Sequence, residues 1–264
     1  MFEIPAALLS LFYGLTSGYS LAIGLMAVAV IMITTPLTLN STRGMRAMQR
    51  LEPEMRRLQN EYRNDRIKLN EEMMKRYQEH KINPAGSLLP LVAQAAVFVV
   101  MFRILRGLTY APRGSARPIA DAAWTAFGRP DQVADPGFIP RYLSFDSALY
   151  ESLFAKREMM SLGVDLSKSA ASEIVNGIGG ALPYVLLVAV LGALYFILQR
   201  RVAARASIGP TMTVGQHKLL RWLPVVFTVI QLFFLAALVI YYIVQTLARI
   251  VQQTYITRSF SSET

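Results

Sequence analysis

Three stretches of this chain are long, apolar and free of charged side chains, and they limit its possible folds more than any other feature. Tyr19–Leu39, Ile174–Leu198 and Leu223–Ala248 contain no Asp, Glu, Lys or Arg. A helix needs about 20 mostly apolar residues to cross the hydrocarbon core of a bilayer. Only helices and closed barrels can satisfy their backbone hydrogen bonds there. The three stretches therefore predict an all-α membrane protein.

The composition of the whole chain agrees with a membrane location. Of its 264 residues, 53% are hydrophobic and only 17% are charged, whereas soluble domains are usually about 45–50% apolar and about 25% charged. The charged residues gather between the apolar stretches and give a net charge of +10. No other segment is long and apolar enough to form a second core, so we expect a single membrane domain over residues 1–264.

The number of spans depends on a further apolar segment and on the length of the last one. Ser87–Leu108 is apolar enough to cross the membrane, although it carries Gln94 and Arg103. Leu223–Ala248 is too long for one ordinary span and short for two. Two spans would need a tight reversal near residues 235–237. Length alone therefore allows either four spans or five.

The distribution of Lys and Arg favours five spans. Basic loops stay preferentially in the cytoplasm, and residues 40–86 and 199–222 are strongly basic, whereas residues 109–172 are nearly balanced. Five spans place the amino end outside and the carboxyl end, with Arg249 and Arg258, in the cytoplasm; four would place the carboxyl end outside. The expected order is an interfacial segment (1–18), a first span (19–39), a cytoplasmic helical hairpin (40–86), a second span (87–108), an extracytoplasmic loop (109–173), a third span (174–198), a cytoplasmic loop (199–221), a fourth span (222–235), a fifth span (236–257) and a cytoplasmic tail (258–264).

The charged segment 40–86 predicts two antiparallel helices outside the membrane. Its apolar residues recur at spacings of three and four, which is typical of one face of a helix. A polar break at Asn64-Asp65 separates two such stripes. A solvated structural hairpin is the simplest interpretation of the charge pattern. The first stripe consists of Met48, Leu51, Met55, Leu58 and Tyr62, and the second of Leu69, Met73 and Tyr77.

Little in the sequence points to catalysis. The two histidines, His80 and His217, fall in predicted cytoplasmic segments, and no P-loop, HExxH or GxGxxG motif occurs. Cysteine is absent, which excludes thiolate chemistry and Cys-ligated metals. The spans carry no acidic residue, which argues against a proton- or cation-coupled carrier. We therefore expect no enzyme activity, no cofactor, no metal and no small-molecule substrate.

Neutral polar side chains do occur in or near the predicted spans, together with one positive charge. Each can be explained as a hydrogen bond between helices, which contributes about 0.6 kcal/mol on average. Their number favours a second interpretation, in which some of them line a water-filled cavity. The candidate lining residues are Thr34, Thr35, Gln94, Arg103, Thr228, Gln231, Tyr241 and Gln245.

Arg103 is the one charged residue among these candidates. A charge inside hydrocarbon costs at least about 2.5 kcal/mol unless it reaches water or a partner. Arg103 comes late in its span and could extend to the outer headgroups beside Arg106. The alternative is a cavity role, in which its fixed positive charge would attract an acidic peptide.

Several motifs resemble those of one known family. Arg46–Met55 reads RAMQRLEPEM, and Lys81–Pro90 reads KINPAGSLLP with Gln94 four residues later. Trp222–Thr228 reads WLPVVFT, and Val251–Ile256 reads VQQTYI. Taken in this order, the motifs are similar to those of the YidC-type membrane protein insertases, which include mitochondrial oxidase-assembly and chloroplast albino-type proteins.

This resemblance implies five helices around a hydrophilic groove that is open to cytoplasm and lipid, with the hairpin near its mouth. In the family, a client's polar tail enters the groove while its apolar segment moves into lipid, without nucleotide hydrolysis. The expected function is that of an insertase and folding chaperone in the inner membrane of a bacterium. The alternative is a membrane scaffold that binds assembling subunits without moving their polar tails.

The resemblance also suggests partners. These are nascent membrane protein clients, membrane lipids, the Sec translocon and the ribosome. Methionine side chains accept varied apolar surfaces, so the hairpin could dock client segments through Met48, Met55, Met73 and Met74. Packing between the two hairpin helices is the alternative role for these side chains.

One departure from the family bears on the groove. Its members usually carry an arginine in the first span, five residues before the proline that matches Pro36, and here Ile31 occupies that position. The groove charge is therefore either missing or moved, and Arg103 is the candidate for a moved charge.

Overall fold

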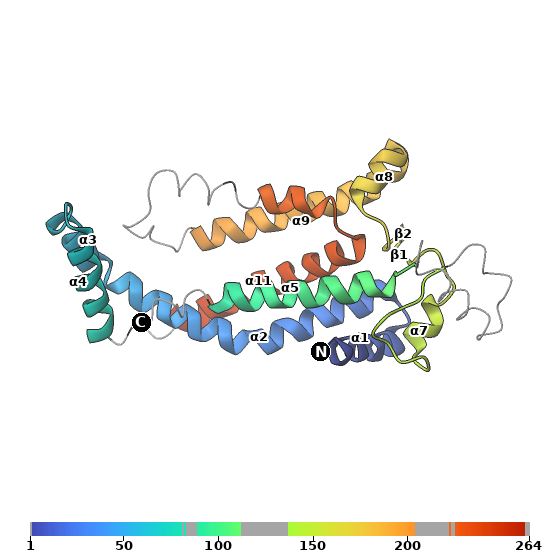
Figure 1. The fold of residues 1–264 in the computed structure, drawn as a ribbon, viewed down its shortest axis with the longest axis horizontal. Helices are drawn as coiled ribbons and strands as arrows, with labels where there is room; N and C mark the ends of the chain where they lie inside the picture. Colours follow the sequence, from blue (N-terminus) through green and yellow to red (C-terminus); the bar gives the residue numbers. More distant parts are fainter. Residues whose placement is uncertain are drawn as a thin grey trace. The chain divides into compact units, whose positions relative to one another are not determined.

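The computed structural model describes residues 2–80, 82, 89–111, 137–203, 222 and 225–261. The described part is mostly helical, with one two-stranded antiparallel hairpin (Figure 1), and this confirms the predicted helical class. The helices are α1 (Glu3–Thr16), α2 (Tyr19–Arg50), α3 (Glu52–Glu61), α4 (Arg66–Glu79), α5 (Leu89–Leu108), α7 (Ala148–Leu153), α8 (Ala170–Asn176), α9 (Ile178–Ala203) and α11 (Ala236–Ser261); the strands are β1 (Met160–Ser161) and β2 (Val164–Asp165). Most of the predicted cytoplasmic loop 199–221 lies outside the described residues.

Two helical segments within the described ranges are long and apolar enough to cross a membrane. They are Tyr19–Leu39 of α2 and Ile178–Arg200 of α9, with mean hydropathies of 2.1 and 2.4. α2 continues through Pro36, although a proline cannot donate the backbone hydrogen bond at that turn, and ends only at Arg50. The structure thus supports two of the expected spans, and the number of five stays a prediction.

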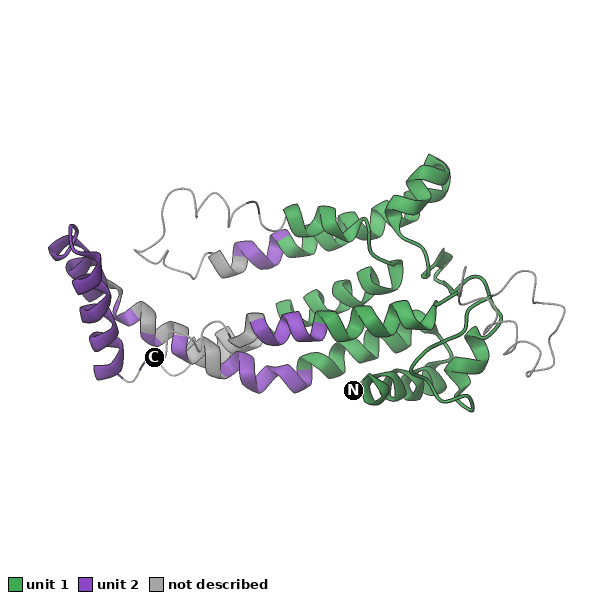
Figure 2. Ribbon diagram, in the orientation of Figure 1, with its two compact units in different colours: residues 1–31, 98–195, 225–264 green, residues 32–97, 196–224 purple. Residues whose placement is uncertain are grey.

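The chain forms two compact units (Figure 2). Unit 1 comprises residues 1–31, 98–195 and 225–264, and unit 2 comprises residues 32–97 and 196–224.

In unit 1, the first half of α2 has one buried face and one exposed face. Ala22, Ile23 and Met26 are almost fully buried, whereas Leu21 and Leu25 are exposed. The buried positions recur at helical spacing, as expected for a helix that packs on one side and meets lipid on the other. Small residues on the buried side let other helices approach closely.

The first residues of α11 are deeply buried in unit 1. Every residue from Ala236 to Tyr242 is at most 7% exposed. Gly24 of α2 lies against α11, because a Cβ at this position would be 3.6 Å from Cγ2 of Val244. The core of unit 1 is therefore built around the start of α11.

Backbone hydrogen bonds join residues 166–171, which lead into α8, to residues 232–237, where α11 begins. The Ala171 amide donates to the Leu232 carbonyl at 2.8 Å, and the Ala236 amide donates to the Lys168 carbonyl at 2.8 Å. These bonds hold the turn that separates the helical segment 225–231 from α11, in the region where the sequence predicts a reversal. We call this contact the loop–turn pairing.

A buried carboxylate supports the loop–turn pairing. Asp165 is 4% exposed, and its Oδ1 accepts hydrogen bonds from the amides of Met159 and Ser167, both at 3.0 Å, and from Oγ of Ser167 at 2.7 Å. Nζ of Lys168 lies 3.7 Å from Oδ2. Partial burial lowers the pKa of Lys168, but attraction to Glu173 and Asp165 outweighs this and raises the pKa above its usual value. This network fixes the segment that carries the pairing.

In unit 2, α3 packs against α4 as a hairpin of two helices. The apolar stripe from Met48 to Tyr62 does not lie on one continuous helix as predicted, because α2 ends at Arg50 and α3 starts at Glu52. Pro53, at the start of α3, cannot donate to the preceding turn and so favours a new helix there. α4 begins after Asp65, whose side chain accepts from the Lys68 amide at 3.0 Å.

Candidate functional site

Three polar side chains lie on one face of α11. Tyr241, Gln245 and Arg249 follow each other at intervals of four residues, so they lie above one another on the helix. Tyr241 is fully buried and Gln245 is 2% exposed. Nε2 of Gln245 donates to the Tyr241 hydroxyl at 3.3 Å. The apolar first half of α11 thus carries two buried polar side chains on one face, Tyr241 and Gln245, followed by the half-buried Arg249.

Gln231, in the helical segment 225–231, adds an unsatisfied acceptor to this region. It is 4% exposed, and its side chain shares a hydrogen bond with the phenol of Tyr195 on α9. Among the described residues, Oε1 of Gln231 has no hydrogen-bond partner. A buried acceptor without a partner costs about 1–3 kcal/mol. This oxygen is therefore a place where water or a passing N–H group would bind favourably.

Arg249 supplies the positive charge of the region. It comes 13 residues after the start of α11, which corresponds to about 20 Å along the helix axis. It is half-buried, and its guanidinium is close enough to interact electrostatically with the phenols of Tyr195, Tyr241 and Tyr242. We define the polar cluster as Tyr195, Gln231, Tyr241, Tyr242, Gln245 and Arg249, all within unit 1.

Arg249 was not among the predicted site residues. It falls within the predicted fifth span (236–257), but from the sequence it was used only as a positive charge of the cytoplasmic carboxyl end. The four-residue spacing from Tyr241 through Gln245 to Arg249 was the signal that could have found it. Arg103, the predicted candidate, is exposed on α5, and Arg106 beside it lies over the Phe102 ring at 5.6 Å. The exposure of both Arg103 and Arg106 fits a position of these side chains near the lipid headgroups.

The remaining candidates of the predicted groove are distributed over both units. Thr34, Thr35 and Gln94 belong to unit 2 and are half-buried. The hydroxyl of Thr38 donates to the Thr34 carbonyl at 3.0 Å within α2. Gln231, Tyr241 and Gln245 gather in the polar cluster of unit 1.

Thr228 takes part in a close contact between helices. A Cβ on Gly192 of α9 would lie 2.7 Å from Cγ2 and 3.1 Å from Oγ1 of Thr228. The helical segment 225–231 therefore approaches α9 directly at this point. Thr228 thus fits the packing interpretation better than the groove interpretation.

Replacing Gly192 by alanine is expected to lower the free energy of unfolding by about 1–3 kcal/mol, because the new methyl group would force the two helices apart. Unfolding in a denaturing-detergent titration measures this change. Gly179→Ala on the same helix is the control, since its Cβ would have no atom within 4 Å. Thr228→Ala should restore part of the lost stability in the double variant. An equal effect of Gly192→Ala and Gly179→Ala would contradict the close contact.

The hairpin methionines differ in their exposure. Met55 is 3% exposed, so it packs inside the hairpin, and Met73 is half-buried. Met74 is 50% exposed. The side chain of Met48 lies outside the described residues. Among the three described side chains of this set, Met74 is therefore the one presented to solvent.

The chain is similar to a set of known membrane proteins. Residues 11–263 match the family described as 60Kd inner membrane protein. The protein named "Membrane protein insertase YidC" from Geobacter sulfurreducens is 28% identical over 254 residues, which cover 96% of this chain and 36% of the relative. The protein of the same name from Marinobacter nauticus is 29% identical over 97% of this chain and 35% of the relative. The chain thus spans about a third of the length of these relatives.

Proposed function

Because the chain belongs to the 60Kd inner membrane protein family, as its motifs suggested, we propose that it guides apolar segments of nascent membrane proteins into the lipid bilayer. The names of its relatives support this activity. The polar cluster supports it physically, because a buried polar face on an apolar helix can hold water within the membrane. The single observation that carries the proposal is the cluster's combination of a half-buried cation with a buried, unpartnered acceptor.

The proposed mechanism needs no nucleotide. Water near the polar cluster shortens the stretch of hydrocarbon that a client's hydrophilic tail must cross. The client's apolar segment then drives the step, since Leu, Ile, Phe and Val each contribute about 0.3–0.6 kcal/mol on transfer into the membrane. Oε1 of Gln231 would accept a hydrogen bond from water or from the backbone of the passing tail.

Arg249 takes the role of the groove charge in this proposal. A cation in a medium of low polarity attracts an opposite charge more strongly than it would in water. Ile31, which stands where the resemblance leads us to expect an arginine, is buried at 7% exposure and brings no charge. An acidic tail would therefore be drawn toward α11.

The family relationship supports a location in the inner membrane of a bacterium, and the distribution of Lys and Arg supports the orientation. We place the chain in the inner membrane of a bacterium, with five spans, its amino end outside and its carboxyl end in the cytoplasm. The basic hairpin would then face the cytoplasm, where the Sec translocon and the ribosome are candidate partners. Thr34, Thr35 and Gln94 of unit 2 remain candidate lining residues on the client's path.

Reconstitution in otherwise protein-free liposomes tests the proposal. A single-span client is added from outside, and protease protection of its translocated tail is measured with and without the purified chain. Protection should rise several-fold in its presence. If the client binds the reconstituted chain while protection stays at the level of empty liposomes, the chain is a scaffold that retains subunits without moving their tails.

A further inference from the structure

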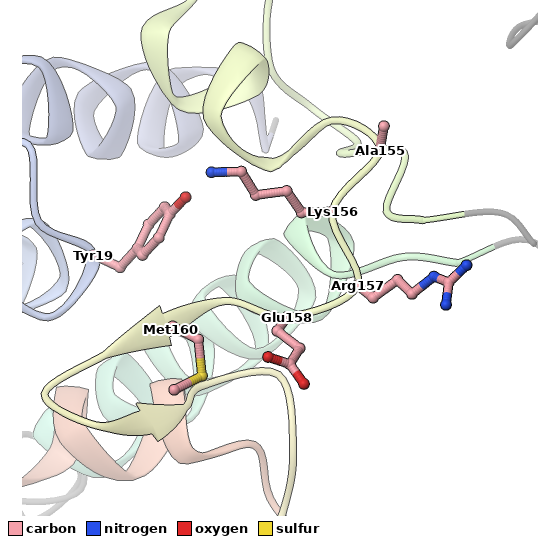
Figure 3. Close-up of a pocket in the computed structure, with 6 residues that line it drawn as sticks. All are labelled: Tyr19, Ala155, Lys156, Arg157, Glu158 and Met160. Carbon is pink, nitrogen blue, oxygen red and sulfur yellow. The ribbon is translucent and has the colours of Figure 1, made fainter. Parts of the chain in front are cut away.

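A pocket of about 570 Å³ lies beside the amino-terminal end of α2, and none of its lining residues belongs to the polar cluster. It is lined by Tyr19, Ala155, Lys156, Arg157, Glu158 and Met160, all in unit 1. In Figure 3 the Lys156 side chain extends toward Tyr19, and the Glu158 carboxylate points toward the side on which Met160 lies. The pocket therefore has a cationic part and an anionic part that are spatially separate.

Hydrogen bonds fix this pocket before any ligand arrives. The Phe138 amide donates to the Lys156 carbonyl at 2.7 Å, and the Ala155 amide donates to the Phe138 carbonyl at 3.1 Å. The Met159 amide donates to the buried carboxylate of Asp165. The segment that carries the charged lining is thus held at both ends, and a preformed site loses less conformational entropy when it binds a ligand.

Hydrogen bonds join the region of the pocket to the first residues of a membrane span. Tyr19 and Ser20 begin the apolar segment Tyr19–Leu39. The Tyr19 hydroxyl donates to the Ser152 carbonyl at 3.2 Å, and the hydroxyls of Ser20 and Ser161 are 2.8 Å apart. The first residues of a span lie where hydrocarbon meets headgroups, a region in which tyrosine is enriched. The pocket therefore sits at headgroup depth.

Exposed apolar side chains beside the pocket indicate that its ligand is a lipid. Met160 is 50% exposed and Leu162, in the turn between β1 and β2, is 81% exposed. Exposed apolar side chains at this depth are stabilised by contact with acyl chains. A ligand of this site would thus combine a charged head with apolar chains.

We propose that the pocket binds the headgroup of a phospholipid that carries both a phosphate and a primary ammonium, as in phosphatidylethanolamine. Lys156 would hold the phosphate through charge-assisted hydrogen bonds, and Glu158 would accept hydrogen bonds from the ammonium. Arg157 extends away from Lys156 (Figure 3) and adds positive charge to the rim of the pocket. Glu158 disfavours a purely anionic head, and a choline head has no N–H to donate. The site is independent of the insertase activity proposed above.

Native mass spectrometry of the full chain in detergent tests this site. Phosphatidylethanolamine, phosphatidylglycerol and phosphatidylcholine with identical acyl chains are titrated separately. Phosphatidylethanolamine should bind about tenfold more tightly than either of the others, and both Lys156→Ala and Glu158→Gln should weaken it by a similar factor. Glu151→Gln, an exposed change on α7 outside the pocket, should leave the affinity unaltered.

Two further measurements make the outcome decisive. Soluble phosphoethanolamine, which lacks acyl chains, should bind far more weakly than the lipid; comparable binding would show a headgroup or phosphate site without a lipid requirement and would overturn the proposal. Equal affinity for the three lipids, or unchanged binding in Glu158→Gln, would overturn it as well. Because Lys156 and Glu158 are exposed, we expect both variants to fold, and their elution from a size-exclusion column checks this.

Discussion

Clients with acidic tails are expected to insert about tenfold less efficiently when Arg249 is replaced by methionine. The half-buried guanidinium, which interacts electrostatically with the phenols of Tyr195, Tyr241 and Tyr242, is the charge of the polar cluster. A tenfold change corresponds to about 1.4 kcal/mol, which is modest for the loss of one charge pair in a medium of reduced polarity. The measurement is protease protection in liposomes, with two clients that differ only in having Asp or Asn in the tail.

The comparison with other arginine variants makes this prediction specific. Arg249→Lys keeps the positive charge and should retain most of the activity toward the acidic client. Arg103→Met removes an arginine that is exposed on α5 and should affect both clients little. An equal loss for acidic and neutral clients in Arg249→Met would mean that Arg249 only stabilises the fold. If Arg103→Met lowers insertion of the acidic client but not of the neutral one, Arg103 on α5 is the charge of the groove, which is the alternative that the sequence suggested.

Replacing Asp165 by alanine is expected to lower the free energy of unfolding by about 3 kcal/mol. The change leaves the amides of Met159 and Ser167 and the hydroxyl of Ser167 without their acceptor. A buried polar group that loses its partner costs about 1–3 kcal/mol. The loop–turn pairing between residues 166–171 and 232–237 should loosen as well. Unfolding in a denaturing-detergent titration measures the stability.

Two controls accompany this variant. Asp165→Asn retains an Oδ1 acceptor and should lose less stability than Asp165→Ala. Asp146→Ala removes an exposed carboxylate of the same loop and should change the free energy of unfolding by less than about 0.5 kcal/mol. Equal stabilities of Asp165→Ala and Asp146→Ala would show that the buried carboxylate does not hold the loop–turn pairing.

The candidate site was predictable only in part. Tyr241, Gln245 and Gln231 were identified because polar side chains are conspicuous in apolar stretches, and all three lie in the polar cluster. Arg249 was missed because it was used only as a positive charge that favours a cytoplasmic carboxyl end. Thr228 was assigned to the groove, yet Gly192, 36 positions earlier in the chain, brings α9 against it.

The sequence by itself determined the helical membrane class and the family. Hydropathy, helical periodicity and short motifs are local properties, and they can be read without knowing which segments meet. Only the tertiary structure decided that Arg249 interacts electrostatically with three tyrosines, that Asp165 supports the loop–turn pairing, and that Tyr19 shares a pocket with Lys156 and Glu158. Each of these contacts depends on the packing of side chains or segments whose direction no local pattern specifies.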